Sequence, residues 1–394
     1  YGLHWIQPDL PLAHPFDDGS TAAVHQSLGL TAGELGTDGP RYRRLFGSPV
    51  ANWDKVAHEF LGPLRLPRYP LVMVNFGLRA VWPAKTVARL VFGTEQAQAL
   101  FAGLAAHAIM PLEWPATAAF GVMLGALGHI VGWPVPRGGS QAIADALAAY
   151  LVDLGGEIVT GHEVASIAEL PAARAILLDV TPRQVVKLAG ERLPTWYRRL
   201  LQGYRYGAGV FKIDWALSEP IPWQAEAPRR AGTVHIGASL AEICASEELV
   251  WQGLPSRHPY TLVTQQSLFD STRAPAGQHT GWAYCHVPHG STVDMTVVIE
   301  NQIERFAPGF KETIRARHTM TTYDLQRYNP NYIGGDINGG VQNWRQLFTR
   351  PVPRRDPYST PDPGLFICSS ATPPGGGVHG MCGYHAAQSV LKQG

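Results

Sequence analysis

The sequence predicts a mixed α/β protein with more than one hydrophobic core. Strand and helix patterns alternate from Ser140 to Pro182, and strand patterns dominate between Gly207 and His289. A strand, a glycine-rich loop and a helix pattern follow from Gly364. This order is typical of layered sheets with helices packed on them. The length of 394 residues is sufficient for more than one core.

The composition excludes several classes of function. The chain is 45% hydrophobic and 16% charged, with a net charge of +1 and no basic stripe with interleaved aromatics, so we expect no nucleic-acid partner. None of the four cysteines forms a C-x-x-C pair, so neither a zinc site nor a disulfide framework is indicated. We therefore expect no metal, and a reducing, cytoplasmic location.

The first residues are predicted to form a hairpin. Leu3 to Ile6 and Leu10 to Ala13 are short apolar runs around a polar break, and Asp17-Asp18-Gly19 is a turn signal. No signal-peptide pattern follows Tyr1. Because the pattern starts in the middle of a hairpin, we expect the sequence to be a fragment of a longer protein.

The segment from Lys85 to Trp133 is predicted to be helical and apolar. Its last part, from Ala116, approaches the ~20 apolar residues of a membrane span, but His129 lies inside it. We expect a buried core helix. The alternatives are a membrane span, a helix that lines an apolar substrate channel and a helix that lies on a membrane surface.

A regular helix pattern follows Ser140, which is predicted to cap it. Gly155-Gly156 is predicted to end it, because glycine adopts the left-handed conformation that ends helices. One face is apolar: Ile143, Ala146, Leu147, Tyr150, Leu151 and Leu154. Further strands are predicted over 157–160, 163–167, 175–180, 209–215, 233–236, 260–264 and 280–287, with helices from Pro182 and over 293–306 and a loop over 323–343.

The last part of the chain is predicted to bind a nucleotide-type ligand. A short strand from Gly364 to Ser369 leads into Gly375, Gly377 and Gly380, which match G-x-G-x-x-G, and a helix follows over 381–391. Glycines let a ligand approach the backbone, and a helix N-terminus offers free N–H groups. A dinucleotide fingerprint needs a second strand and an acidic residue about twenty positions later. We therefore expect a closing element of a cofactor site, with a ligand-free glycine turn as the alternative.

Two long runs resemble the phytoene desaturase-like flavoproteins. Pro136 to Ile167 resembles the middle of these proteins, and Ser369 to Ala387 (SSATPPGGGVHGMCGYHAA) resembles their closing flavin motif. Trp282 to Pro288 (WAYCHVP) and Ile333 to Ile337 (IGGDI) resemble one branch most, the bacterial relatives of pyridine nucleotide-disulfide oxidoreductase domain-containing protein 2. The helix that ends at Gly155-Gly156 is shared with a wider superfamily that includes amine oxidases.

The resemblance implies a Rossmann-like FAD-binding domain of the amine oxidase/phytoene desaturase type and a substrate domain with a mixed sheet and apolar helices. It divides the chain into a helical substrate part (1–135), a middle FAD-binding segment (136–205), the substrate sheet (206–354) and a closing FAD-binding segment (355–394). Members of the family begin with a βαβ unit, and none is present before Tyr1. We therefore expect an incomplete FAD-binding domain, and neither tight FAD binding nor activity from residues 1–394 alone.

The resemblance also implies site residues. Val164 would meet the adenine side of FAD, Thr181 the pyrophosphate, and Ser370 and Ala371 the ribityl chain. The residues that would face the flavin are Gly375, Gly376, Gly377, Val378, His379 and Gly380.

No catalytic residue is identified by the pattern. The candidates are His379 and Arg137, with His385 as a further acid–base candidate, and each has a structural or solvent-facing alternative. Asp336 either positions a loop or contacts a ligand.

The function implied is that of an FAD-dependent oxidoreductase, a dehydrogenase, desaturase or isomerase, acting on an apolar and polyene- or carotenoid-like small molecule. The alternatives are a flavoprotein amine oxidase and a non-catalytic interaction protein that retains the fold. A peripheral contact with a membrane is a further expectation, and the sequence does not indicate an oligomeric state.

Overall fold

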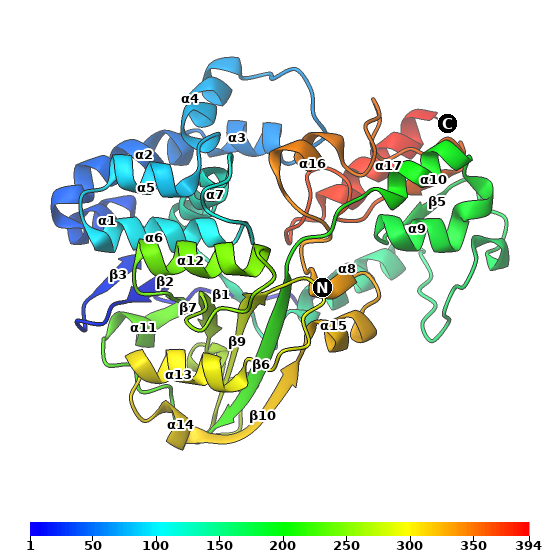
Figure 1. Cartoon of the computed structure of the whole chain (residues 1–394). Coiled ribbons are helices and arrows are strands. Elements are labelled where there is room, and N and C mark those ends of the chain that lie inside the picture. Colours follow the sequence, from blue (N-terminus) through cyan, green and yellow to red (C-terminus); the bar gives the residue numbers. More distant parts are fainter. Residues whose placement is uncertain (394) are drawn as a thin grey trace.

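The computed structural model describes residues 1–393, and within them a seven-stranded mixed sheet is the largest element. Its order is β10-β6-β9-β8-β7-β2-β3, and its neighbours are antiparallel except for β2 and β7. Figure 1 shows this sheet with helices above and below it. The strands are β2 (Leu10–Pro15), β3 (Thr21–Val24), β6 (Gly209–Leu217), β7 (Ala231–Ile236), β8 (Thr261–Thr264), β9 (His279–Val287) and β10 (Ile314–Met320).

The central strands form where the sequence predicts them. β6 to β9 confirm the four strand patterns between Gly207 and His289, and β6 pairs with β9 over their whole lengths. The sequence pattern does not predict β10, because its residues IRARHTM are mostly polar. β10 is an edge strand with exposed charged side chains, a composition that discourages pairing with another chain.

Helices cover both faces of the large sheet and enclose two cores. One core packs β2 and β3 against the first group of helices, and the other packs β6, β7 and β9 against the second group. The first group is α1 (Leu28–Glu34), α2 (Gly39–Ala51), α5 (Ala84–Val91), α6 (Glu95–Ala106), α7 (Ala118–Ile130) and α12 (Leu240–Trp251). The second group is α11 (Ala227–Arg230), α13 (Thr296–Phe306) and α14 (Phe310–Thr313).

The apolar segment before Trp133 is a buried core helix, as predicted. A methyl group on Gly125 of α7 would lie 2.4 Å from the ring of Phe46 in α2, so α7 and α2 are in contact. His129 is tolerated in this core because its Nε2 shares a 2.9 Å hydrogen bond with the Tyr42 hydroxyl. Among residues 1–393, no helix combines the length and the apolar character needed to cross a membrane.

A polar cluster is buried between the large sheet and the helices α6 and α12. His107 and His235 share an Nε2–Nε2 hydrogen bond of 3.0 Å, and His286 Nδ1 lies 2.8 Å from both carboxylate oxygens of Glu247. Burial lowers the pKa of His14 to about 4 and that of His107 to about 3, and it also lowers the pKa of His235. His14, His107 and His235 are therefore neutral inside the folded protein at neutral pH.

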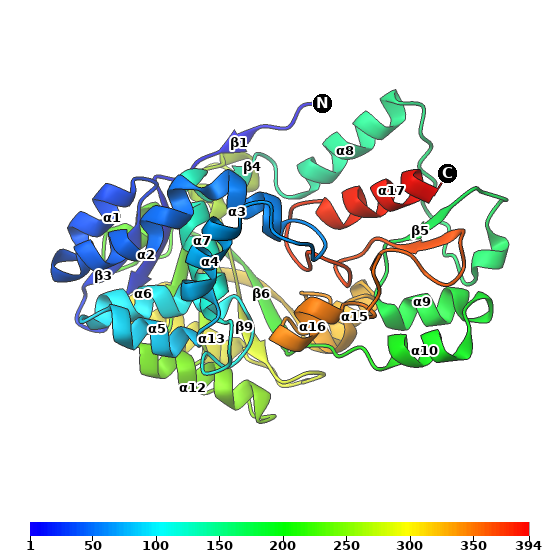
Figure 2. The ribbon, with the colours of Figure 1, turned by 90° about the horizontal axis from the view of Figure 1, so that it is seen from above.

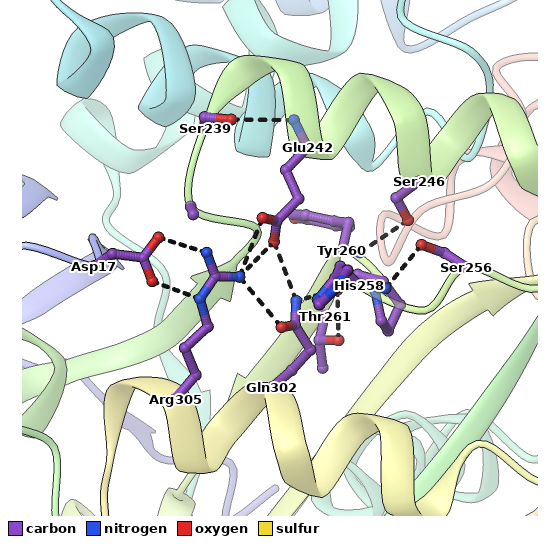
Figure 3. A network of polar contacts seen from close by, with 12 residues as sticks. Asp17, Ser239, Glu242, Ser246, Ser256, His258, Tyr260, Thr261, Gln302 and Arg305 are labelled. Carbon is purple, nitrogen blue, oxygen red and sulfur yellow. Dashed lines mark hydrogen bonds and ion pairs between the residues drawn. The ribbon is translucent and has the colours of Figure 1, made fainter.

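An ion-pair network ties the hairpin at the start of the chain to the helical layers (Figure 3). Arg305 of α13 pairs with Asp17, in the turn between β2 and β3, and with Glu242 of α12 at 3.0 Å. The hydrogen bonding of the Arg305 guanidinium to the Asp17 carboxylate is the main cause that raises the pKa of Arg305. The predicted turn is confirmed. The Leu3 to Ile6 segment does not join this hairpin, because β1 (Trp5–Ile6) pairs with β4 (Val135–Pro136).

A second region is built on a two-stranded parallel sheet. β5 (Ile176–Leu178) and β11 (Leu365–Ile367) pair in register although they are far apart in the chain. Figure 2 shows α8 (Gln141–Asp153), α9 (Pro182–Ala189), α10 (Thr195–Gln202) and α17 (Met381–Gln393) gathered around it, on the side of the molecule away from α1. The strands predicted over 175–180 and 364–369, and the helices that follow them, are confirmed.

The remaining helices include two that add Val56, Phe76 and Ala80 to the first core. They are α3 (Trp53–Phe60), α4 (Pro70–Ala80), α15 (Thr322–Tyr328) and α16 (Trp344–Thr349). The 3-10 helices are η1 (Gly36–Asp38), η2 (Ile167–Glu169), η3 (Gly190–Arg192), η4 (Gln266–Leu268), η5 (Ser271–Arg273) and η6 (Ile333–Gly335).

Two predictions of local structure are wrong. The segments 157–160 and 163–167 are not strands, because no strand in residues 1–393 pairs with them. The loop predicted over 323–343 begins with α15, where Thr321 and Asp324 form a capping box. A threonine followed three residues later by an acid is a helix-start pattern, so the sequence contained this signal.

The helix α8 differs from its prediction at the start and on its surface. Ser140 has helical φ and ψ angles of −62° and −22°, and within the described residues its side chain makes no capping bond. The end is as predicted, with Gly155 at a φ of +84°. The predicted apolar face is not buried: no residue of α8 is buried in residues 1–393, and Leu147 and Leu154 are 64% and 68% exposed.

Candidate functional site

The carboxyl ends of β5 and β11 meet at one edge of the parallel sheet, where ligands bind in folds of this kind. Thr181 follows β5, and Ser370 and the buried Ala371 follow β11. Thr181 is 2% exposed, and its N–H donates to Asn331 Oδ1 at 2.9 Å. Its hydroxyl neither caps α9 nor has another partner in residues 1–393. This edge therefore holds a buried hydroxyl that is not used by the fold.

The glycine segment, Gly375 to Gly380, connects this edge to α17. Gly375, Gly377 and Gly380 have φ angles of +107°, +145° and +66°, which glycine adopts without strain. Val378 is 91% exposed, and a methyl group on Gly380 would meet no atom within 4 Å. The outer face of the segment is therefore open, and α17 begins directly behind it, where the first N–H groups of a helix have no partner within the helix.

Asp336 fixes the loop that supports the glycine segment. Its buried carboxylate accepts N–H bonds from Gly207, Asn338 and Gly340 at 2.7, 2.8 and 2.9 Å. Burial raises the pKa of Asp336, and these hydrogen bonds oppose that shift. A methyl group on Gly376 would lie 2.8 Å from the Asn338 carbonyl oxygen, so this loop touches the glycine segment directly. In this structure Asp336 positions a loop.

Arg350 lies behind the glycine segment. It is 1% exposed, and a methyl group on Gly375 would lie 2.1 Å from its Nη1. Nη2 donates to the Tyr204 hydroxyl at 3.0 Å, whereas Nε and Nη1 are buried without a partner in the described chain. The sequence does not reveal this residue, because arginines among prolines form no motif and arginines are mostly exposed.

A pocket of about 590 Å³ lies between α4 and the segment 347–357, and we call it the α4 pocket. Its volume is in the range of small-molecule sites. Pro373 and Pro374, directly before the glycine segment, form part of its wall. Its apolar wall includes Phe60, Met73, Phe76, Leu347, Phe348 and Val352. Its charged lining residues are Glu59, Arg65, Arg350, Arg354 and Arg355.

The two histidines of the closing segment have structural partners. His379 Nδ1 accepts the N–H of Met381 at 3.0 Å, in the first turn of α17. Burial lowers the pKa of His379. His385 Nε2 lies 2.8 Å from the Leu61 carbonyl oxygen and so joins α17 to the segment after α3.

The other predicted site residues lie in different places. Arg137 is exposed, and its N–H donates to the His4 carbonyl at 2.9 Å beside the β1–β4 pair. Val164 is half-buried in coil between α8 and η2 rather than in a strand. The structure therefore brings Thr181, Ser370, Ala371 and the glycine segment to one sheet edge.

The chain has a mixed α/β fold that it shares with solved oxidoreductases. The chain superposes on an oxidoreductase from Methanosarcina mazei with a TM-score of 0.61 and 14% identity, covering 99% of this chain and 82% of that one. It superposes on a putrescine oxidase bound to putrescine with a TM-score of 0.55 and 13% identity, covering 99% and 83%. At these identities the likeness is one of fold, and it confirms the predicted fold class.

Sequence comparison gives a more specific relative. Over 344 residues the chain is 29% identical to pyridine nucleotide-disulfide oxidoreductase domain-containing protein 2 of Mus musculus, covering 75% of this chain and 59% of that protein. The chain thus spans about three fifths of the length of this relative. No family model matches the chain.

Proposed function

We propose that this chain is part of an FAD-dependent oxidoreductase that dehydrogenates or isomerises an apolar, polyene-like small molecule. The observation that carries the proposal is the open glycine segment, which joins the carboxyl edge of a parallel sheet to the N-terminus of α17. The fold shared with solved oxidoreductases supports the same reading.

The residues at this edge fit a flavin nucleotide. The unpartnered Thr181 hydroxyl and the N–H groups at the start of α17 are donors for anionic or carbonyl oxygens. Four of the six residues in the glycine segment are glycines, which let a flat ring approach the backbone closely, and Ser370 and Ala371 lie beside it. Val164 is proposed for the adenine side. When bound, a flavin accepts a hydride from a substrate carbon, and the protein positions the substrate and excludes water.

The α4 pocket supports an apolar substrate. Aromatic and aliphatic side chains from α3, α4 and α16 line it, and two of its prolines, Pro373 and Pro374, directly precede the glycine segment. A flavoprotein amine oxidase is less well supported, because Arg65, Arg350, Arg354 and Arg355 would repel an ammonium group.

A peripheral membrane contact is a further proposal, and α4 supports it. Leu71, Val74 and Leu78 lie on one face of α4 and are 84%, 60% and 67% exposed. Leu66, in the segment before α4, is 94% exposed and is followed closely by Arg68. Such a face with basic neighbours suits an anionic lipid surface. Co-sedimentation with anionic vesicles should weaken in Leu71→Ser, and unchanged binding would contradict it.

The visible spectrum tests the proposed function. We expect the full-length protein, with any segment that precedes Tyr1, to be yellow after purification. An apolar polyene should bleach its flavin. Gly380→Val should lower flavin retention at least tenfold, because a branched residue at a φ of +66° costs on the order of 1–3 kcal/mol and blocks the open face.

Gly383→Ala is the matched control, because Gly383 lies in α17 where an added methyl group meets nothing within 4 Å. It should retain flavin. A colourless, stably folded full-length protein would contradict the proposal and favour a non-catalytic interaction protein. Bleaching by an alkyl amine rather than a polyene would favour the amine oxidase alternative.

A further inference from the structure

The α4 pocket is lined by more positive than negative side chains. Arg65, Arg350, Arg354 and Arg355 line it, and Glu59 is its acidic lining residue. Glu59 is already engaged, because it accepts the backbone N–H groups of Arg68 and Tyr69 at 2.7 and 3.1 Å. Its other oxygen lies 3.6 Å from Arg65. The charges of the other arginines are therefore left without a partner from the pocket wall.

Two of these arginines have buried nitrogens that the fold does not use. Within residues 1–393, Nε and Nη1 of Arg350 and Nε of Arg354 are buried without a hydrogen-bond partner. The remaining bonds of Arg354 are long, at 3.5 Å to Ser359 Oγ and 3.4 Å to the Thr360 carbonyl. Buried guanidinium nitrogens without partners are costly, and a carboxylate satisfies them best because two parallel N–H bonds can form.

The rest of the pocket suits a hydrocarbon. Phe60, Met73 and Phe76 face it from α3 and α4, and Leu347 and Phe348 face it from α16. Burying hydrocarbon contributes roughly 0.8 kcal/mol per CH₂, so an apolar wall of this kind favours a long chain. An arginine end and an apolar wall together define an amphiphile site.

We propose that the α4 pocket binds an apolar chain with a terminal carboxylate, held by Arg350 and Arg354. This inference rests on the proposed function where it names the substrate class, whereas the binding step itself requires no flavin. Because the Arg350 guanidinium contacts Gly375, the carboxylate end of the chain lies beside the glycine segment. The carbons close to the head group are then the ones nearest to the cofactor edge.

The test is a binding competition with the full chain. A fluorescent polyene fatty acid, cis-parinaric acid, is displaced by oleate or by oleyl alcohol, which share the hydrocarbon chain and differ in charge. We expect oleate to bind about tenfold more tightly, since a hydrogen bond to a charged group contributes about 1.5–3 kcal/mol and 1.4 kcal/mol corresponds to tenfold. Equal affinities would overturn the proposal.

Variants locate the binding site. Arg350→Gln and Arg354→Gln should each weaken oleate about tenfold and leave oleyl alcohol unchanged. Arg345→Gln is the matched control, because Arg345 is exposed on α16 and does not line the pocket. Circular dichroism would show whether Arg350→Gln unfolds. In that case Arg354→Gln and Arg350→Lys are used to compare the affinities for oleate and oleyl alcohol. Variants that bind oleate as Arg345→Gln does would overturn the assignment.

Two further outcomes separate this inference from the proposed function. A protein that binds oleate through Arg350 but retains no flavin would support the inference and contradict the oxidoreductase. Loss of flavin in Arg350→Gln with unchanged oleate affinity would overturn the inference, since the guanidinium would then serve the cofactor. Displacement of oleate by millimolar inorganic phosphate alone would also overturn it, because the site would then select a phosphate group.

Discussion

The two sheets of this protein differ in how completely their side chains are covered. In the seven-stranded sheet every residue of β2 and β8 is buried, and helices pack on both faces. In the parallel sheet, by contrast, Leu177 of β5 is 39% exposed, and α8 in the same region has no buried residue within the described chain. An apolar pattern therefore predicts an element in both regions but predicts its burial in only one of them.

The largest expected effect comes from the buried contact between Glu247 and His286 in the large-sheet region. Glu247→Ala leaves His286 without its partner in a dry interior, and we expect a loss of about 3–5 kcal/mol in the free energy of unfolding. Urea denaturation measures it. Glu248→Ala, one residue further on the exposed side of α12, should change stability by less than about 0.5 kcal/mol. Similar losses in both variants would break the contrast between buried and exposed positions.

The buried histidines should make this region sensitive to acid. The folded pKa of His14 is about 4 and that of His107 about 3, whereas the ordinary value is 6.5. The unfolded chain therefore binds more protons below pH 6.5, and stability falls as the pH drops from 6.5 towards 4. One pKa unit corresponds to about 1.4 kcal/mol, so each group contributes on the order of 3 kcal/mol.

Thermal melting between pH 4 and pH 7 checks this prediction. The Tm should fall on acidification, and His14→Gln and His107→Gln should each flatten the curve, because glutamine does not titrate in this range. A Tm that is constant from pH 7 to pH 4 would show that these imidazoles are not held neutral.

The smallest effect is expected on α8. Leu147→Ala removes a side chain that is 64% exposed, and we expect a change of less than about 0.5 kcal/mol. Leu104→Ala on α6 removes a fully buried side chain and should cost about 2–5 kcal/mol. Chemical denaturation of both variants sharpens the comparison. A large loss in Leu147→Ala would mean that the face of α8 is covered in solution.

The sequence predicts the fold well wherever apolar residues repeat with a clear period. The strands β6 to β9, the core helix α7 and the strand–glycine–helix unit at β11 and α17 all have such patterns. β10 has none, because an edge strand needs polar side chains. The segments 157–160 and 163–167 have strand-like composition, but pairing depends on a neighbour that composition does not specify.

The sequence predicts the glycine segment of the candidate site but not the roles of the charged side chains around it. Glycines at Gly375, Gly377 and Gly380 report a backbone requirement, and this requirement can be read from one sequence. Asp336 is a candidate from the sequence, but the choice between its two roles, like the role of Arg350, depends on burial and on partners brought from distant segments. Neither of those properties leaves a local pattern in the sequence.

The pairing of β5 with β11 has a consequence for synthesis on the ribosome. β5 emerges before every strand from β6 to β10, but its partner emerges only after all of them. The large sheet can therefore assemble while β5 and its neighbouring helices lack β11, and side chains such as Leu178 and Val185, which share a core with Leu365 and Ile367, are still open to water. During that interval the nascent chain exposes an apolar surface of the kind that chaperones bind. The expression yield should therefore depend on how quickly the segment that contains β11 is translated.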